Sequence, residues 1–228
     1  MTANPESGEI LAFLTEKVGE VMKQGPWCHG WDHTLRVLEN ARRIQEIEGG
    51  NRFVVECAAV LHDVGRGFED RKGCHAETGA KHAGEILCEA GLRDEFLVGR
   101  IIECVRRHRY RRREELPPVT LEAMIVYDAD KLDSLGAVGV GRAFHFAGRI
   151  GARVHNTAKE AIGGEEHGPE DTALREYLVK LRYLPGSLYT AEGRRRAKER
   201  AAYMKNFFVR FCKETGTGDT LPDFLEKG

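Results

Sequence analysis

The stretch AAVLHDVGR, residues 58–66, places an adjacent histidine and aspartate directly behind an apolar helical run. Apolar residues recur before it at helical spacing, so we predict a helix that Asn51 caps and that stops at Gly65. A helix dipole favours a histidine near the helix C-terminus but disfavours an aspartate there. A helix end therefore accounts for His62 and leaves Asp63 unexplained, whereas a bound cation accounts for both.

The rest of the chain shows the same helical periodicity, and strand-like alternation is hardly seen. The sequence therefore predicts an all-α, single-domain helical bundle over residues 1–215, with a C-terminal tail over 216–228. The polar, glycine-rich segment 151–169 is expected to be a loop. Besides the helix before Gly65, we expect helices at about 8–24, 31–48, 75–90, 94–109, 120–135, 138–150, 170–184 and 190–214.

The composition excludes several classes of protein. The 228 residues are 41% hydrophobic and carry a formal net charge of −1, which argues against general nucleic-acid binding. No apolar run approaches the ~20 residues needed to span a bilayer, so we expect no membrane partner. The N-terminus lacks the basic and then apolar order of a secretory signal, so the expected location is cytoplasmic. Nothing in the sequence indicates an oligomeric state.

Six cysteines form an even set, but their spacing does not match a thiolate zinc hook. A chain of this length does not need disulfides for stability, so we interpret them as buried or incidental thiols. The sequence also contains no P-loop, no GxSxG elbow and no HExxH pair. A P-loop NTPase, a serine hydrolase and a zincin are therefore disfavoured.

Further histidines and carboxylates lie on amphipathic helices in similar settings. His33 sits at the start of a predicted helix, and Asp128, Asp130 and Asp133 fall within VYDADKLD, residues 126–133. At least one of these three acids must border the core, and the three repel one another. A divalent metal would relieve that repulsion. Two imidazoles with two carboxylates form a mixed nitrogen and oxygen set suited to Mn, Fe, Co, Ni, Zn or Mg.

The order His33, then His62 and Asp63, then Asp130 resembles the HD-domain superfamily of metal-dependent phosphohydrolases. The matching segments are DHTLRVLENA (32–41), AAVLHDVGR (58–66), HAETGAKHAGEIL (75–87), IIECVRRH (101–108), TLEAMIVYDADKLDSLGAVGVGRAF (120–144) and SLYTAEGRRRAKERAAYMKNFF (187–208). The last two of these segments are similar to a bacterial and archaeal HD-hydrolase subgroup.

The resemblance implies that His33, His62, Asp63 and Asp130 ligate a divalent metal ion, and that Asp63 also orients the attacking water. It implies hydrolysis of a phosphate ester or anhydride of a small phosphorylated substrate, with a nucleotide the favoured class. Nucleotidase, nucleoside triphosphate pyrophosphatase and phosphodiesterase reactions all stay open. The alternative is a catalytically silent, metal-dependent nucleotide-sensing or nucleotide-binding module.

Five further residues are expected to bind substrate: Arg66, His75, His108, Lys131 and Asp133. Arg66 is favoured as a phosphate contact over a solvated arginine at a helix end. Lys131 either neutralises a phosphate or pairs with Asp128 or Asp133. His75 and His108 decide between one metal and two, and we favour substrate contact because no second carboxylate for a two-metal site is evident.

The segment RRHRYRRR, residues 106–113, holds six arginines around a histidine and a tyrosine. We favour a charged, solvated helix end over a phosphate-attracting rim, and both over nucleic-acid binding. Arg109 stands where the resemblance predicts a small polar residue, which leaves the substrate rim less defined than the metal site.

Overall fold

The structure is a computed structural model. It describes residues 5–23, 30–68, 75–110 and 113–218. This part of the chain consists of helices joined by turns and bends, with no strand, so the all-α prediction is confirmed. None of its helices is both long and apolar enough to cross a membrane.

The chain folds into two compact units. Unit 1 comprises Met1–Asp130 and the returning segment Tyr189–Gly193, and unit 2 comprises Lys131–Leu188 and Arg194–Gly228. The single domain expected over 1–215 stays a prediction, and each unit is described by itself.

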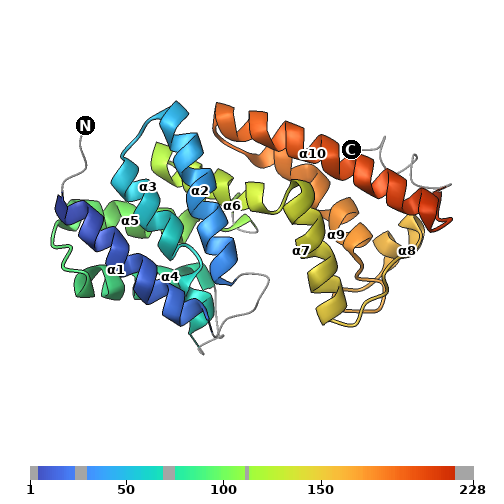
Figure 1. The fold of residues 1–228 in the computed structure, drawn as a ribbon, viewed down its shortest axis with the longest axis horizontal. Helices are drawn as coiled ribbons and strands as arrows, with labels where there is room; N and C mark the ends of the chain where they lie inside the picture. The colour runs from blue at the N-terminus through green and yellow to red at the C-terminus, as the bar shows by residue number, and fades with distance from the viewer. Residues whose placement is uncertain (1–4, 24–29, 69–74, 111–112, 219–228) are drawn as a thin grey trace. The chain divides into compact units, whose positions relative to one another are not determined.

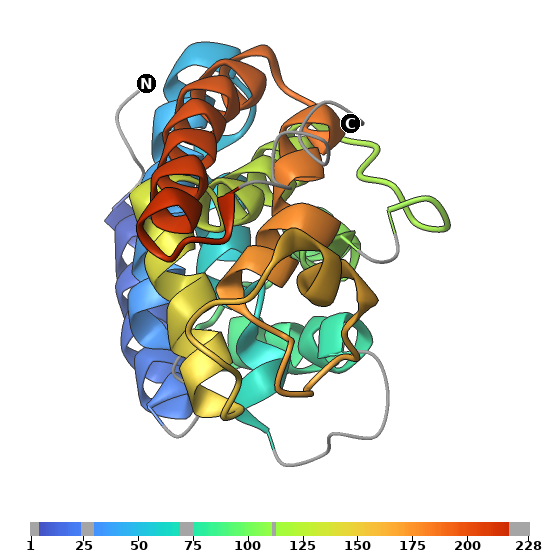
Figure 2. The ribbon, with the colours of Figure 1, turned by 90° about the vertical axis from the view of Figure 1, so that its right-hand side faces the viewer.

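Unit 1 is built from helices that pack in pairs, α2 with α3 and α4 with α5, and α3 also packs on α5 (Figures 1 and 2). Its core holds fully buried aliphatic side chains such as Leu14, Ile44, Leu61 and Ile101. The elements are α1 (Pro5–Met22), α2 (Trp31–Glu48), α3 (Arg52–Leu61), the 3-10 helix η2 (Val64–Gly67), α4 (His75–Glu89), α5 (Glu95–Arg107) and α6 (Leu121–Asp133), whose last three residues belong to unit 2.

The α2–α3 connection follows local signals in the sequence. α2 ends at Gly49, whose φ of 83° lies in the left-handed region that glycine adopts without strain. The side chain of Asn51 then accepts a hydrogen bond from the backbone N–H of Val54, so the predicted cap of α3 is confirmed. The helical periodicity predicts that Leu35, Leu38, Ile44 and Ile47 form the buried face of α2, but Leu35 and Ile47 are 41% and 63% exposed.

α3 ends at Leu61, earlier than the predicted stop at Gly65. His62 and Asp63 form a turn, and η2 follows it. A Cβ atom on Gly67 would lie 2.9 Å from the carbonyl oxygen of Val21 in α1, so only glycine allows η2 to approach α1 this closely. Close backbone packing against α1 thus holds η2, the element that follows His62 and Asp63, in place.

Unit 2 contains a helix inside the segment 151–169, which we had predicted to be a loop. Thr157 and Glu160 form a capping box that starts this helix, and Asn156 donates a hydrogen bond to the carboxylate of Glu170. The loop prediction was therefore wrong for the central part of the segment. The elements of unit 2 are α7 (Gly136–Arg149), α8 (Ala158–Gly163), α9 (Ala173–Val179), the 3-10 helix η4 (Leu181–Ser187) and α10 (Ala191–Glu214), whose first three residues belong to unit 1.

The helix predicted over 170–184 is shorter than expected. α9 ends at Val179, because Lys180 has φ −141° and ψ −59° and leaves the helical path. Pro185 has no N–H to donate and disfavours the α conformation in the residue before it, so the chain continues as 3-10 helix η4. The core of unit 2 includes the ring of Tyr177 stacked on Phe208, with centroids 4.5 Å apart.

Candidate metal centre

The ends of four helices in unit 1 bring five chemically active side chains together. His33 lies in the first turn of α2, and His62 and Asp63 directly follow α3. His108 directly follows α5, and Asp130 lies in the last turn of α6. The three histidines and Asp63 are at most 2% exposed. The protein therefore buries polar groups that need partners at this place.

Four side-chain atoms of this group converge. The Nε2 atoms of His33 and His62 are 3.2 Å apart, and the Oδ1 atom of Asp130 lies 3.4 Å from the Nε2 atom of His33. The Oδ2 atom of Asp63 lies 3.9 Å and 3.8 Å from the same two nitrogen atoms. The ligand atoms of His33, His62 and Asp130 all lie within 4.8 Å of one another.

Backbone carbonyls orient two of the imidazole rings. The Nδ1 atom of His62 lies 2.8 Å from the carbonyl oxygen of Ala59, and the Nδ1 atom of His108 lies 2.6 Å from that of Val105. Because a carbonyl oxygen only accepts, each Nδ1 carries the proton. The Nε2 atom of each ring is therefore turned toward the cluster, as in histidines that bind a metal through Nε2.

Burial lowers the pKa of His62 to about 4, although the carboxylates of Asp63 and Asp130 oppose this shift. His62 is thus a neutral imidazole at neutral pH, and with Nδ1 protonated its Nε2 atom holds a lone pair. That lone pair points at the Nε2 atom of His33. The Nε2–H group of His33 can donate a hydrogen bond to this lone pair, and a bound cation would take the place of that proton.

The donor set fits a divalent ion. Nitrogen and carboxylate oxygen ligands lie about 2.0–2.2 Å from such ions. Two ligands of one ion at tetrahedral or right angles then lie roughly 3.0–3.5 Å apart, close to the spacings of His33, His62 and Asp130. Two imidazoles and two carboxylates suit several transition metals and do not select one.

Asp63 links the cluster to two further groups. Its Oδ2 atom lies 2.7 Å from the Nε atom of Arg66, and its Oδ1 atom lies 3.4 Å from the Nε2 atom of His108. In this structure Arg66 therefore contacts Asp63, a partner that the sequence did not indicate. The predicted phosphate contacts of Arg66 and His108 remain predictions.

The other predicted substrate residues are placed differently. The side chain of His75, the first residue of α4, lies outside the described part of the structure. Lys131 is 7% exposed, and Asp133 is buried in unit 2, where the Nη1 atom of Arg142 lies 2.9 Å from its Oδ2 atom. Asp133 thus has a structural partner, and its role in substrate binding remains a prediction.

Two hydrogen-bonded contacts near Asp130 were not predicted from the sequence. Asn40 is buried in α2 and donates from Nδ2 to the carbonyl oxygen of Ala129, next to Asp130. Its position seven residues after His33, on the same helical face, was the available signal. Asp128 accepts hydrogen bonds from the backbone N–H groups of Tyr189 and Thr190. No local signal indicates that contact.

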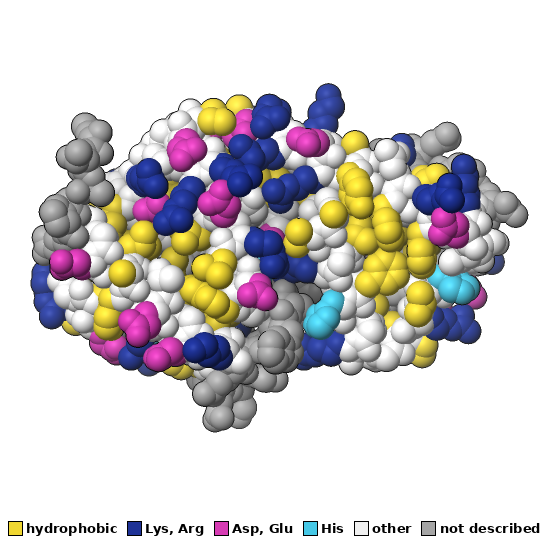
Figure 3. Space-filling view, in the orientation of Figure 1, with side chains coloured by type: hydrophobic (Ala, Val, Ile, Leu, Met, Phe, Trp, Pro, Cys, Tyr) yellow, Lys and Arg dark blue, Asp and Glu magenta, His cyan; other side chains and the backbone are white. Residues whose placement is uncertain are grey.

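The arginine-rich segment is mostly paired with acids and carbonyls. Arg106 contacts Glu77, Arg107 donates to the carbonyl oxygen of Pro117, and Arg113 stacks over the ring of Tyr110 at 4.2 Å. Residues 111–112 lie outside the described part. Acidic side chains also lie among the basic ones on the face seen in Figure 3. The contacts of Arg106, Arg107 and Arg113 favour a charged helix end over a nucleic-acid surface.

Comparisons with known proteins identify a family and a relative of this chain. The family model of the HD domain matches residues 30–135, a range that contains all four predicted metal ligands. The YpgQ protein of Bacillus subtilis is 32% identical over 188 residues, which make up 82% of this chain and 84% of YpgQ.

Solved structures are similar over nearly the whole chain. The crystal structure of Bacillus subtilis YpgQ in complex with ADP has a TM-score of 0.69 and 27% identity, and the match covers 92% of this chain and 96% of that one. An HD-superfamily hydrolase from Bacillus thuringiensis has a TM-score of 0.71 and 28% identity, with 92% and 98% covered.

Proposed function

This chain belongs to the HD-domain superfamily, and we propose that it is a metal-dependent phosphohydrolase that acts on a small phosphorylated substrate of the nucleotide class. The superfamily membership supports a hydrolase. The observation that carries the metal dependence is the buried convergence of His33, His62 and Asp130, with Asp63 beside them. Evidence for the nucleotide comes from YpgQ, which was crystallised with ADP.

We assign His33, His62, Asp63 and Asp130 as the residues that hold the ion. When bound, a divalent ion lowers the pKa of a coordinated water to about 7 and polarises a phosphoryl oxygen. The protein supplies a neutral imidazole at His62, because burial keeps that ring unprotonated at neutral pH. A neutral ring can donate its lone pair without first losing a proton.

Asp63 is the residue that we assign to orient the attacking water. Its two oxygen atoms face different neighbours, since Oδ2 lies toward the two histidines and Arg66 while Oδ1 lies toward His108. A water held by Oδ1 would lie within reach of the His108 ring, which can take up a proton. Arg66 keeps the Asp63 carboxylate in this orientation.

The substrate contacts that we propose are those of Arg66, His75, His108, Lys131 and Asp133. Arginine and lysine neutralise phosphate charge, and a histidine donates a hydrogen bond to a phosphate oxygen. Which phosphate bond is cleaved depends on how these residues bind and orient the phosphate groups of the substrate. An activity assay is therefore needed to identify the bond that is cleaved.

The test is to purify the protein without chelator, measure its metal content, and screen a nucleotide panel for phosphate and pyrophosphate release with added Mn, Co, Ni or Mg. We expect turnover with at least one metal. Asp63→Ala should abolish turnover and preserve the helical circular dichroism signal. The exposed neighbour of His33 supplies a matched control, since Asp32→Ala should change neither metal content nor turnover.

Bound metal without turnover on any nucleotide would favour the catalytically silent sensor instead. In that case, nucleotide binding measured by calorimetry should still depend on the metal. Full activity in Asp63→Ala would show that the site assignment is wrong.

A further inference from the structure

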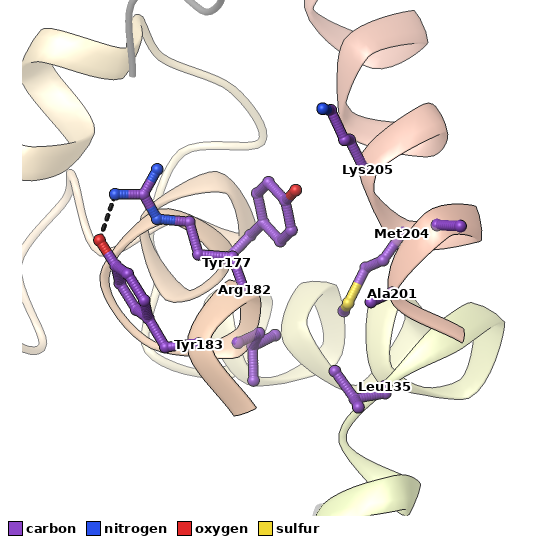
Figure 4. Close-up of a pocket in the computed structure, with 9 residues that line it drawn as sticks. Leu135, Tyr177, Arg182, Tyr183, Ala201, Met204 and Lys205 are labelled. Carbon is purple, nitrogen blue, oxygen red and sulfur yellow. Dashed lines mark hydrogen bonds between the residues drawn. The ribbon is translucent and has the colours of Figure 1, made fainter. Parts of the chain in front are cut away.

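Unit 2 contains a cavity of about 250 Å³ that the proposed reaction does not use. Its walls come from α9, η4 and α10, together with Leu135, the residue before α7 (Figure 4). Leu135, Leu181 and Met204 give it an apolar floor, and all three are at most 3% exposed. The cavity can therefore place an apolar group against a buried apolar wall.

The polar part of the cavity is cationic. Arg182 and Lys205 line it, and no acidic side chain does. Figure 4 shows Tyr177 between these two cations. Arg182 is held in place because its Nη2 atom donates to the hydroxyl of Tyr183 and its guanidinium lies 4.6 Å from the ring centre of Tyr183. Among the described residues, no carboxylate pairs with Lys205, so its charge is available to a ligand.

Tyr177 presents a hydrogen-bond donor to this space. The residue is 4% exposed, and its ring is fixed by stacking on Phe208. No described residue forms a hydrogen bond with its hydroxyl. Burial raises the pKa of Tyr177, against the opposing charge of Arg182, so the hydroxyl stays protonated at neutral pH. The hydroxyl is not fully buried, so water can solvate it, and an acceptor on a ligand would take the place of that water.

We infer that this cavity of unit 2, with Tyr177, Arg182 and Lys205 at its polar side, binds a small organic oxyanion: a compact apolar body that carries one carboxylate or phosphate group. An arginine fork matches the geometry of either oxyanion, and lysine adds a point charge. The volume corresponds to roughly eight water molecules at ~30 Å³ each, which is the scale of one aromatic ring with one charged group. Nothing in the inference depends on the metal ligands of unit 1.

The test uses the full-length, metal-loaded protein and three probes of similar size: benzoate, phenyl phosphate and neutral benzyl alcohol. Saturation-transfer NMR and calorimetry measure the dissociation constants. We expect benzoate, phenyl phosphate or both to bind at least about tenfold more tightly than benzyl alcohol. Binding of benzoate alone identifies a carboxylate ligand, and binding of phenyl phosphate alone identifies a phosphate ligand. Equal binding of all three, or of none, would overturn the inference.

Variants locate the binding. Lys205→Gln should weaken binding of the oxyanion about tenfold, whereas Lys213→Gln, at an exposed position on the same helix, should leave the affinity unchanged. Asp63→Ala should bind the probe as the wild type does, which separates this cavity from the metal centre. Unchanged affinity in Lys205→Gln, or loss of affinity in Asp63→Ala, would place the probe elsewhere and contradict the inference.

The variant Tyr177→Phe tests whether the Tyr177 hydroxyl donates a hydrogen bond to the ligand or only stabilises the fold. The variant keeps the ring that stacks on Phe208 and removes only the hydroxyl. We expect weaker oxyanion binding with an unchanged or higher melting temperature, because the hydroxyl has no partner in the described protein. The control is Tyr203→Phe, which removes the hydroxyl of a tyrosine that is 50% exposed. A clear fall in the melting temperature of Tyr177→Phe, with unchanged binding, would refute the role of Tyr177.

Discussion

Glu122 connects three of the four helices that carry the proposed metal cluster, and its replacement should weaken both of the contacts that join them. The carboxylate sits in the first turn of α6, and its Oε1 atom accepts a hydrogen bond of 2.8 Å from the backbone N–H of Asn51 at the start of α3. Its Oε2 atom lies 2.6 Å from the Nη2 atom of Arg100 in α5. Glu122 is only 4% exposed. His62, His108 and Asp130 are carried by these same helices.

The expected loss of stability follows from the two contacts of Glu122. A hydrogen bond to a charged group contributes about 1.5–3 kcal/mol when buried. The Arg100 side chain is 29% exposed, so water screens its ion pair and we discount that contact to about 1 kcal/mol. Glu122→Ala removes both contacts and should lower the free energy of unfolding by about 3 kcal/mol. Glu122→Gln keeps an acceptor for Asn51 and should cost about 1–2 kcal/mol.

The same residue predicts a pH dependence with a definite sign. Burial alone would raise the pKa of Glu122, but the Asn51 N–H and the Arg100 guanidinium outweigh it and hold the pKa below the ordinary value of 4.5. The unfolded chain therefore binds the proton more readily than the folded one. The stabilisation is fully present above pH 4.5 and is lost as the pH falls through the lower folded pKa. Glu122→Gln should lack this component of acid sensitivity.

Urea unfolding followed by circular dichroism at pH 7 and at pH 4 measures both effects. Glu46→Gln in α2 is the matched control, because that side chain is exposed. A double-mutant cycle with Arg100→Met isolates the ion pair from the backbone contact. If Glu122→Ala unfolds within about 0.5 kcal/mol of the wild type, the reasoning that this carboxylate joins the three helices is wrong.

Three further predictions concern other parts of the chain. Burial raises the pKa of Cys57 and of Cys104 to about 12, so iodoacetamide at pH 7.5 should leave both unlabelled in the native protein and should label the exposed Cys88, as read by mass spectrometry. Asp128→Asn should lower the free energy of unfolding by about 2–3 kcal/mol in a urea titration, because Asp128 is fully buried and accepts hydrogen bonds from the N–H and hydroxyl of Thr190. Chelation of a metal present at about 100 times its dissociation constant should remove about 2.7 kcal/mol of stability, and a melting temperature that EDTA leaves unchanged would contradict a bound ion.

Sequence reasoning located the parts of the fold that local chemistry decides. The left-handed glycine at 49 and the cap at Asn51 act within four residues of where they stand, so both were visible in the sequence. α8 was missed although its signal was present, since Thr157 and Glu160 have the spacing of a capping box. The glycine and acidic residues around it suggested a loop and outweighed that signal.

Contacts between residues far apart in the chain could not be predicted in the same way. The pairing of Asn51 with Glu122 spans 71 residues, and that of Asp128 with Thr190 spans 62. The residues around each of these positions do not indicate which distant group will form the hydrogen bond. The family pattern supplied the ligand order, whereas the Arg66 contact to Asp63 follows from the turn of η2, which is a property of the folded backbone.

The three aspartates of α6, Asp128, Asp130 and Asp133, have separate roles in the fold. At about 100° per residue, Asp130 points roughly 160° away from Asp128 and 60° away from Asp133 around the helix axis. Asp128 accordingly receives N–H groups of the returning segment, and Asp133 meets Arg142 in unit 2. Asp130 lies next to the cluster, with its Oδ1 atom 3.4 Å from the Nε2 atom of His33. The repulsion expected among these three aspartates is thus reduced by three different partners, and only Asp130 is part of the proposed metal site.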